Sequence, residues 1–305
     1  MNNESTLNAI AAKVLVVLGY FDYFKYPLTR AQIFQFLSIQ LDSEQELQPA
    51  LLQLCADKHI ECFNGYYALR SVETYVQERI EGEARFEALQ ERIGKTVDRV
   101  RKFPFVKFAG LSGSLSKGYA PANADVDLFI ITSANRLWIC RTLLHLMKKM
   151  TFLKDSQHYY CMNYFIDETA LLIEEQNFFT AIELSTLKPL IDADDYYTQL
   201  LNHNREWLSR EIPNFRISPP GGTPKPVPFW GAGLVNSLSS NWLNAQLMRL
   251  TDRKWRNKWE KRKFPAEDYP LAFKTRISVS KNHLHNYQKK LLRHLDQLRK
   301  DSAQQ

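Results

Sequence analysis

The sequence has few cysteines and none of the spacings that cysteine chemistry needs. Four cysteines occur in 305 residues, at Cys55, Cys62, Cys140 and Cys161, and none stands in a Cys-x-x-Cys pair. The seven histidines likewise show no metal-type spacing. A disulfide framework and a zinc knuckle are therefore not indicated. We expect a reducing, cytoplasmic setting.

Long apolar runs are also missing. A membrane-spanning helix needs about 20 predominantly apolar residues, and the best candidate, Ala9 to Phe21, is interrupted by Lys13. No Lys or Arg precedes this run and no small-residue cleavage site follows it, so it does not resemble a signal peptide. We expect an ordinary buried helix here, and no membrane partner.

Charge is unevenly distributed along the chain. The formal net charge is +7. Residues 251–305 contain 15 Lys and Arg against six Asp and Glu, a net charge of +9, which leaves −2 for the rest. The apolar and charged fractions are otherwise those of a folded globular protein, and the length suggests about two domains. The basic character therefore belongs to the C-terminal segment.

The first 70 residues predict three helices followed by a hairpin. Apolar residues recur at helical spacing over residues 7–24. Thr29 is placed to cap a second helix, and Ser43-x-x-Glu46 is a capping box for a third. Asn64-Gly65, between two short apolar runs, favours a tight hairpin turn. This order of elements resembles a winged-helix domain.

The third of these helices is too acidic to bind the phosphate backbone of DNA. It opens with Asp42, Glu44 and Glu46 and offers only Lys58 and His59 at its end. Contacts to DNA phosphates need Lys or Arg. We therefore expect a protein-contact module or a spacer here rather than a DNA-binding domain.

The middle of the chain predicts a different architecture. Residues 72–101 form one long amphipathic helix by their pattern. From Phe105 the order is strand, short helix, strand, helix, strand, with two more helices after it, so we expect a mixed α/β fold of the α+β type with a central mixed sheet. Residues 213–228, with six prolines, predict a linker or a wrapping loop, and further helices follow.

One stretch, from Leu111 to Thr132, carries a chemical motif. It contains the pair Gly113-Ser114 and, after a gap of ten residues, Asp125-x-Asp127 at the start of an apolar strand. This pattern resembles the signature of the DNA polymerase β-like nucleotidyltransferase superfamily. The resemblance implies transfer of a nucleoside monophosphate from a nucleoside triphosphate to an acceptor, with Mg²⁺ or Mn²⁺ as cofactor.

The residue types suit that chemistry. Gly113 has no side chain to keep a triphosphate from the backbone, and the Ser114 hydroxyl and nearby amides can donate to phosphate oxygens. The period of two in a strand puts Asp125 and Asp127 on one face and Val126 on the other. Two carboxylates so placed can share metal ions. We predict Gly113 and Ser114 as nucleotide-binding residues, and Asp125 and Asp127 as catalytic metal ligands.

Lys117 and the possible third carboxylate determine whether such a site binds nucleotide only or also catalyses transfer. Lys117, in the turn, either reaches a phosphate or lies in solvent. Many active members of the superfamily carry a third carboxylate on the next strand, but here that strand has Asn163 at its centre and Asp167 further on, on the same face. An amide can coordinate a metal but cannot act as a general base. Either Asp167 fills this catalytic role, or another group does, or the site binds nucleotide without efficient transfer.

The basic run Arg253–Lys263 supports two interpretations. Trp255 and Trp259 lie four residues apart, so on a helix they share one face. Aromatic rings among cations suit single-stranded nucleic acid. Alternatively, the tryptophans pack onto the protein and the cations are solvated.

These features predict five segments and three alternative functions. The segments are a winged-helix-like domain at 1–70, a connecting helix at 71–102, a nucleotidyltransferase domain at 103–212, a Pro-rich linker at 213–228 and a helical basic region at 229–305. The first hypothesis is a nucleotidyltransferase whose acceptor is a small molecule, a protein or an RNA. The second is a nucleotide-binding regulatory module. The third is a nucleic-acid-binding protein that uses Arg253–Lys263.

Overall fold

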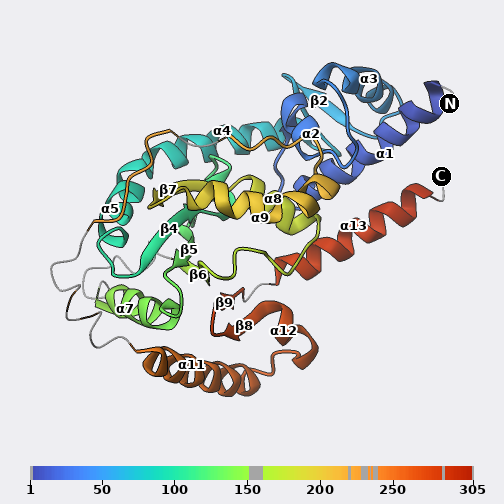
Figure 1. Ribbon diagram of the computed structural model, residues 1–305. Helices are drawn as coiled ribbons and strands as arrows, with labels where there is room; N and C mark the ends of the chain where they lie inside the picture. The colour runs from blue at the N-terminus through green and yellow to red at the C-terminus, as the bar shows by residue number, and fades with distance from the viewer. Residues whose placement is uncertain are drawn as a thin grey trace.

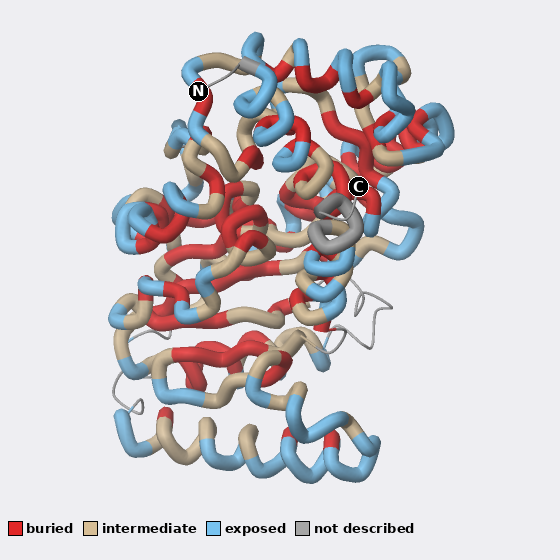
Figure 2. Tube along the Cα trace, turned by 90° about the vertical axis from the view of Figure 1, so that its right-hand side faces the viewer, coloured by how far each residue is buried: buried red, intermediate tan, exposed pale blue. Residues whose placement is uncertain are grey.

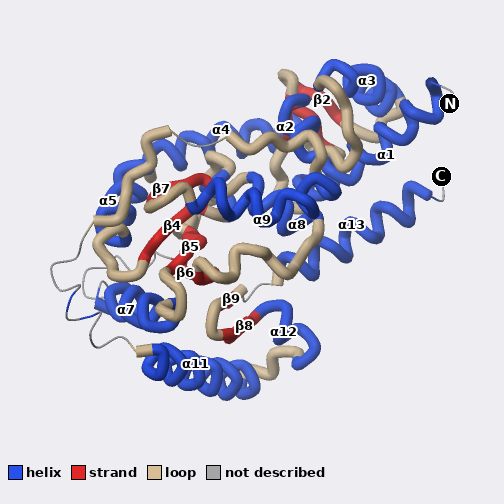
Figure 3. The backbone as a smooth tube through the Cα atoms, viewed as in Figure 1, coloured by secondary structure: helices blue, strands red, loops and turns tan. Residues whose placement is uncertain are grey.

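The computed structural model describes residues 3–150, 161–218, 221–227, 240–283 and 286–303, with the single positions 233 and 235. The fold is mixed α/β, as predicted. A three-stranded sheet lies in the N-terminal unit and a six-stranded mixed sheet in the centre. Helices pack around the central sheet (Figures 1 and 3).

The N-terminal unit contains three helices and a small antiparallel sheet. Its elements are α1 (Asn3–Asp22), β1 (Leu28–Thr29), α2 (Arg30–Phe36), the 3-10 helix η1 (Glu44–Leu47), α3 (Gln48–Ala56), β2 (Glu61–Phe63) and β3 (Tyr66–Ala68). The predicted cap at Thr29 and the predicted capping box at Ser43 are both present, and Thr29 also forms a capping box, with Gln32. Asn64 and Gly65 have positive φ, as a tight hairpin turn requires. The predicted two-stranded hairpin gains a third strand, because β1 pairs with β3.

Helix α1 is the one described helix that is long and apolar enough to cross a membrane by length and composition. Half of that apolar window is buried inside the protein. Val14, Leu18 and Phe21 are almost fully buried, and Gly19 lies against Leu298 of α13 (Tyr287–Ala303). In this structure α1 is therefore a core helix, as the sequence predicts.

The long connecting helix predicted after the hairpin is instead two helices. They are α4 (Val72–Ala88) and α5 (Gln90–Val100), separated at Leu89. Val76 of α4 packs with Ala68 beside the N-terminal sheet, whereas Ile93 and Val100 of α5 enter the core of the central sheet. Phe86 near the end of α4 joins the same core as α5, so the change of packing partner falls within the last turns of α4.

The central sheet has the strand order β7-β4-β5-β6-β9-β8. Its strands are β4 (Val106–Leu111), β5 (Asp127–Thr132), β6 (Cys161–Asp167), β7 (Lys188–Asp192), β8 (Phe273–Arg276) and β9 (Val279–Asn282). β5 and β6 are parallel, with α7 (Leu137–Met150) between them in sequence, and the other neighbours are antiparallel. The first two predicted strands and the described part of the third are confirmed. The expectation of a helical region at 229–305 is wrong where β8 and β9 form, and helix α13 begins only at Tyr287.

Alternate residues of the central strands enter two separate cores. Phe108, Phe129 and Ile131 face a core formed with α8 (Phe178–Ser185), α9 (Tyr196–Glu211) and the N-terminal unit. Ala109 and Ile130 face a second core formed with α5, α7 and α11 (Asn241–Lys261). The strands are apolar on both faces because helices cover both.

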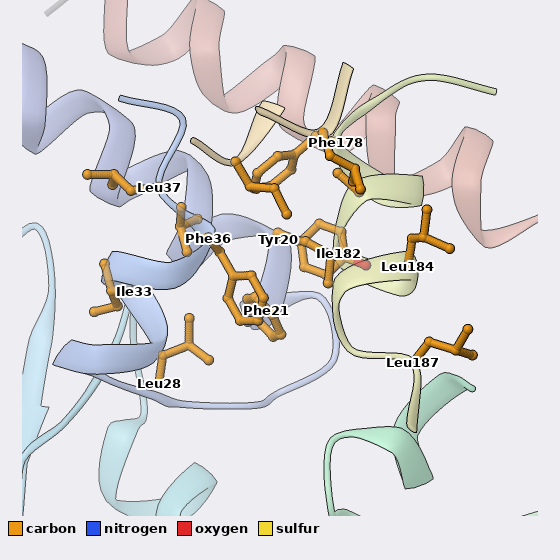
Figure 4. Close-up of a cluster of buried hydrophobic side chains, with 14 of the residues drawn as sticks. Tyr20, Phe21, Leu28, Ile33, Phe36, Leu37, Phe178, Ile182, Leu184 and Leu187 are labelled. Atoms are coloured by element: carbon orange, nitrogen blue, oxygen red, sulfur yellow. The ribbon is translucent and has the colours of Figure 1, made fainter. Parts of the chain in front are cut away.

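The first core joins the N-terminal unit to the central sheet. The ring of Tyr20 from α1 meets the edge of Phe178 from α8, with 5.6 Å between centroids. Phe36 from α2 and Ile182 and Leu184 from α8 belong to the same cluster (Figure 4). The N-terminal unit is thus continuous with the body of the protein through buried apolar contact.

The proline-rich segment wraps over this junction without helix or strand in its described residues. The Asn214 side chain donates to the Phe34 carbonyl at 3.1 Å and accepts from the Leu41 amide at 3.0 Å. Further on, the Pro224 carbonyl accepts from the Asp192 amide at 3.0 Å. The segment therefore runs from the N-terminal unit to strand β7, in agreement with the predicted wrapping loop.

Candidate functional site

The two halves of the Gly-Ser and Asp-x-Asp motif meet in space. Helix α6 (Gly113–Ser116) follows β4, and the Ser112 amide donates to the Asp127 carbonyl at 2.9 Å. Gly113 has a φ of +67°, and a Cβ built on it would lie 3.0 Å from Asp127 Oδ2. A side chain at position 113 would suffer both strain and crowding. Glycine is therefore favoured at position 113 both by the positive φ and by the nearby Asp127 carboxylate.

The carboxylate of Asp127 is in an unfavourable environment for its charge. Its pKa is raised from the ordinary 3.8 to about 6, mainly because burial removes water, and further by the negative charges of Asp125 and Glu183. A hydrogen bond with the Cys161 thiol acts in the opposite direction. Asp125 is exposed and Val126 between the two is buried. The predicted alternation along the chain is therefore present, although the regular strand starts only at Asp127.

Lys117 forms hydrogen bonds within and beside the turn and does not lie free in solvent. Its Nζ donates to the Gly113 carbonyl at 3.1 Å and to Glu183 Oε1 at 2.9 Å. The Lys117 side chain is 15% exposed and that of Glu183 is 29% exposed. Ser116 Oγ also donates to the Gly113 carbonyl, at 2.8 Å. The alternative of a lysine in solvent is therefore wrong, and the contact of Lys117 with a phosphate stays a prediction.

Glu183 is a residue of this neighbourhood that the sequence analysis did not find. It lies on α8, 56 positions after Asp127 in the chain, and no local pattern marks it. Its carboxylate pairs with Lys117 and its charge raises the pKa of Asp127. It therefore adds a third acidic group to the surroundings of Asp127.

Ser114 lies in the first turn of α6 and is half-buried. Its carbonyl accepts from the Lys117 amide at 3.0 Å and the Tyr119 amide at 3.3 Å, which closes the turn. The structure thus places Ser114 directly after Gly113, on the turn that contacts Asp127. Its predicted contact with phosphate stays a prediction.

A thiol and an amide occupy the position where the resemblance leads one to expect a third carboxylate. Cys161 is the register partner of Asp127 across the parallel pair β5 and β6. Asn163 Nδ2 donates to Cys161 Sγ at 2.8 Å. Burial, and then the nearby Asp127 charge, raise the pKa of the Cys161 thiol to about 12. The thiol is therefore neutral at physiological pH, and neither side chain can serve as a general base there.

Asp167 does not join the two aspartates, which corrects the expectation for that residue. Its register partner is Thr132, at the far end of β5, about 16 Å from Asp127 at about 3.3 Å per residue. Its buried carboxylate accepts from the Asn135 amide at 3.1 Å and from the amide and hydroxyl of Thr169 at 3.0 and 2.6 Å. Asp167 therefore stabilises the loops that follow β5 and β6, at the end of these strands opposite to Asp127.

A cavity of about 340 Å³ lies beside the turn, between the N-terminal unit and the central sheet. Ser116 and Lys117 line it from the turn, Tyr26 and Gln32 from the N-terminal unit, and Thr186 from the end of α8. Lys117 therefore belongs to both the cavity wall and the surroundings of Asp127.

The carboxylates are sparse for a metal site built by protein alone. No group of three or more His, Cys, Asp or Glu that could hold a metal ion occurs among the described residues. Magnesium in phosphate-handling sites is commonly held by one or two carboxylates, with water and substrate oxygens completing its shell. Asp125 and Asp127 fit that sparse kind of site.

The tryptophans of the basic run are not available for stacking. Trp255 and Trp259 are 7% and 5% exposed, and both rings pack on Phe273, with centroids 6.0 and 5.1 Å away. The predicted base-stacking surface is therefore wrong, and the alternative, packing onto the protein, is confirmed.

Comparison with known proteins gives no match. No protein-family model, no curated protein and no solved structure matches this chain.

Proposed function

We propose that this protein is a metal-dependent nucleotidyltransferase of the DNA polymerase β-like kind, with a winged-helix-like N-terminal domain. The observation that carries the proposal is the contact between the two motif halves. Gly113 is confined against the Asp127 carboxylate, and Asp125 and Glu183 add negative charge around it. A positive-φ glycine, adjacent serine and clustered carboxylates suit a metal-bound triphosphate.

The residues present fit a divalent cation. Burial and two neighbouring acids raise the pKa of Asp127, so a cation placed beside the carboxylates would relieve an existing repulsion. Asp125 and Asp127 would hold Mg²⁺ or Mn²⁺ through oxygen atoms, the donors that these ions prefer. Such an ion supplies neutralisation of phosphate charge when it is bound.

The protein's own residues then have distinct roles. Gly113 leaves room for phosphate oxygens and Ser114 donates a hydrogen bond to them. Lys117 positions the turn through the Gly113 carbonyl and adds positive charge. Glu183 takes the role first expected of Asp167: it accepts the proton of the acceptor hydroxyl. Geometry supports this choice, since Glu183 lies with the turn and Asp167 does not.

The decisive experiment measures label transfer from nucleoside triphosphates labelled at the α-phosphate. The full-length protein is incubated with each triphosphate, Mg²⁺ or Mn²⁺ and a cell extract that supplies acceptors. We expect labelled product that disappears in Asp125→Ala/Asp127→Ala and persists in Asp167→Asn. No transfer with any triphosphate or either metal would contradict the proposal.

A second candidate function is nucleotide binding without turnover. Cys161 and Asn163, in place of a carboxylate beside Asp127, favour it. Metal-dependent nucleotide binding, measured by calorimetry and lost in Asp125→Ala/Asp127→Ala, would support this candidate if transfer stays undetectable. The N-terminal unit would then report nucleotide occupancy to a partner protein.

A further inference from the structure

The outer face of α11 carries a shallow, open groove in which four of the six lining residues are cations. Its volume is about 430 Å³, and its lining is Leu250, Arg253, Lys254, Asn257, Lys258 and Lys261. The four cationic residues are exposed, and the outer turns of α11 are largely solvent-accessible (Figure 2). At about 1.5 Å per residue the cations extend over about 12 Å of the helix. The groove is therefore a linear, positively charged feature.

The cations of the groove are not balanced by acids. Within the part of the chain that the structure describes, none of Arg253, Lys254, Lys258 and Lys261 forms an ion pair with a carboxylate. Their neighbour Arg256 differs, since it pairs with Asp252 at 2.8 Å. The charge of the groove is therefore available to an external anion.

The positive field extends to the adjacent helix α7. The pKa of buried His145 on α7 is lowered to about 3, mainly by burial and then by the charges of Arg141, Lys148, Lys149 and Lys254. Three of these cations lie on α7 and one on α11, so the two helices contribute to one field. The field also reaches the candidate site, because the charge of Lys148 lowers the pKa of Asp127.

The geometry points to a single-stranded nucleic acid as the partner, and we propose that the α11 groove binds its phosphate backbone. Side chains four residues apart on a helix lie about 6 Å apart, so Lys254 and Lys258 can meet separate phosphates of one extended strand. Binding is independent of sequence, because the buried Trp255 and Trp259 offer no face to the bases. The large apolar residues exposed on α11, Trp242 and Leu250, lie eight positions apart and form no continuous stripe for insertion into a membrane.

The test uses fluorescence anisotropy with a fluorescein-labelled 20-nucleotide oligo(U) or oligo(dT), the full-length protein, and EDTA in place of metal and nucleotide. The variant Lys254→Glu/Lys258→Glu/Lys261→Glu reverses three groove charges. The control Lys13→Glu/Arg205→Glu/Lys225→Glu makes the same change in net charge at exposed sites elsewhere. We expect the groove variant to bind about tenfold or more weakly than the control.

Salt dependence supplies a second readout. Replacing the same three lysines by Gln should reduce the slope of log K against log salt by about 2, since each lost phosphate contact contributes about 0.7 for a single strand. Circular dichroism melts verify that the variants fold. Equal affinity of the groove and control variants would overturn the proposal, as would tighter binding of the wild type to poly-glutamate than to either oligonucleotide. Asp125→Ala/Asp127→Ala should bind normally, so failure of the proposed transfer function leaves this result unaffected.

Discussion

Replacing Asp127 by Asn should stabilise the metal-free protein at neutral pH. The native carboxyl has a pKa of about 6 instead of the ordinary 3.8. This difference of about two pKa units corresponds to about 3 kcal/mol at about 1.4 kcal/mol per unit, which is an upper bound on the free energy of folding lost by ionising Asp127 in place. Asn has nearly the same shape and carries no charge, so it removes this cost.

The sign of the effect fixes its pH dependence. Because the pKa is raised on folding, the native state holds the Asp127 proton between about pH 4 and 6, where the unfolded chain has released it. The wild type therefore loses stability relative to Asp127→Asn as the pH rises through this window. Below about pH 4 both states are protonated and the difference vanishes; above about pH 6 it is complete.

The assay is thermal unfolding in EDTA at several pH values, repeated with excess Mg²⁺ at pH 7.5. In EDTA at pH 7.5 we expect Asp127→Asn to melt up to about 6 °C above the wild type, at about 2 °C per kcal/mol for a chain of this size. Asp125→Asn, a change at an exposed carboxylate, should melt within about 1 °C of the wild type, a shift of about 0.5 kcal/mol. Magnesium should raise the melting temperature of the wild type only.

Two outcomes would refute this reasoning. If Asp127→Asn were less stable than the wild type in EDTA at pH 7.5, native hydrogen bonds would hold the carboxylate more strongly than burial disfavours it. If Mg²⁺ stabilised the double variant Asp125→Asn/Asp127→Asn as much as the wild type, the ion would bind elsewhere.

Three further tests, with four substitutions, separate the parts of the site. Gly113→Ala and Gly118→Ala both place alanine at positive φ, and each should lower the free energy of unfolding by about 1–2 kcal/mol. Only Gly113→Ala should also weaken nucleotide binding in calorimetry, because only its Cβ meets Asp127. Equal nucleotide binding by the two variants would contradict the proposed role of the turn. Asp167→Asn should lower the free energy of unfolding by about 1–3 kcal/mol through lost loop hydrogen bonds, with the rate of label transfer unchanged; a large loss of transfer would restore its catalytic role. Glu183→Gln should slow label transfer about 100-fold or more if it accepts the proton, with nucleotide affinity nearly constant, and a normal rate would exclude it.

The sequence predicted the local parts of this fold well. Capping at Thr29 and Ser43, and the turn at Asn64-Gly65, are local hydrogen-bonding patterns that residue type alone determines. Strands β4 and β5 can be recognised in the sequence as apolar runs, because both faces of these strands are buried. Strand β7 was missed because Lys188 and Pro189 obscure its pattern and its pairing with β4 is settled only by tertiary contact.

The candidate site was predictable only where it is contiguous in sequence. The motif supplied Gly113, Ser114, Asp125 and Asp127, and the structure brings the glycine and Asp127 into contact. The third acid could not be located, because its choice depends on strand register. A residue on β6 near Asp127 must lie at its start, and the register puts Cys161 there. Glu183 comes from a helix whose packing no local pattern reveals.

The raised pKa of Asp127 also bears on whether Asp127 and Gly113 serve stability or function. A carboxylate that is buried beside two other acids lowers the stability of the fold, and a neutral side chain in its place would remove that cost. The same carboxylate and the positive φ favour glycine at position 113, which adds conformational entropy to the unfolded chain. Asp167 presents the opposite case, since three hydrogen bonds satisfy its carboxylate. Residues that destabilise a fold while fitting one another are typical of binding and catalytic sites. This criterion supports the proposed functional roles of Asp127 and Gly113 and a structural role for Asp167.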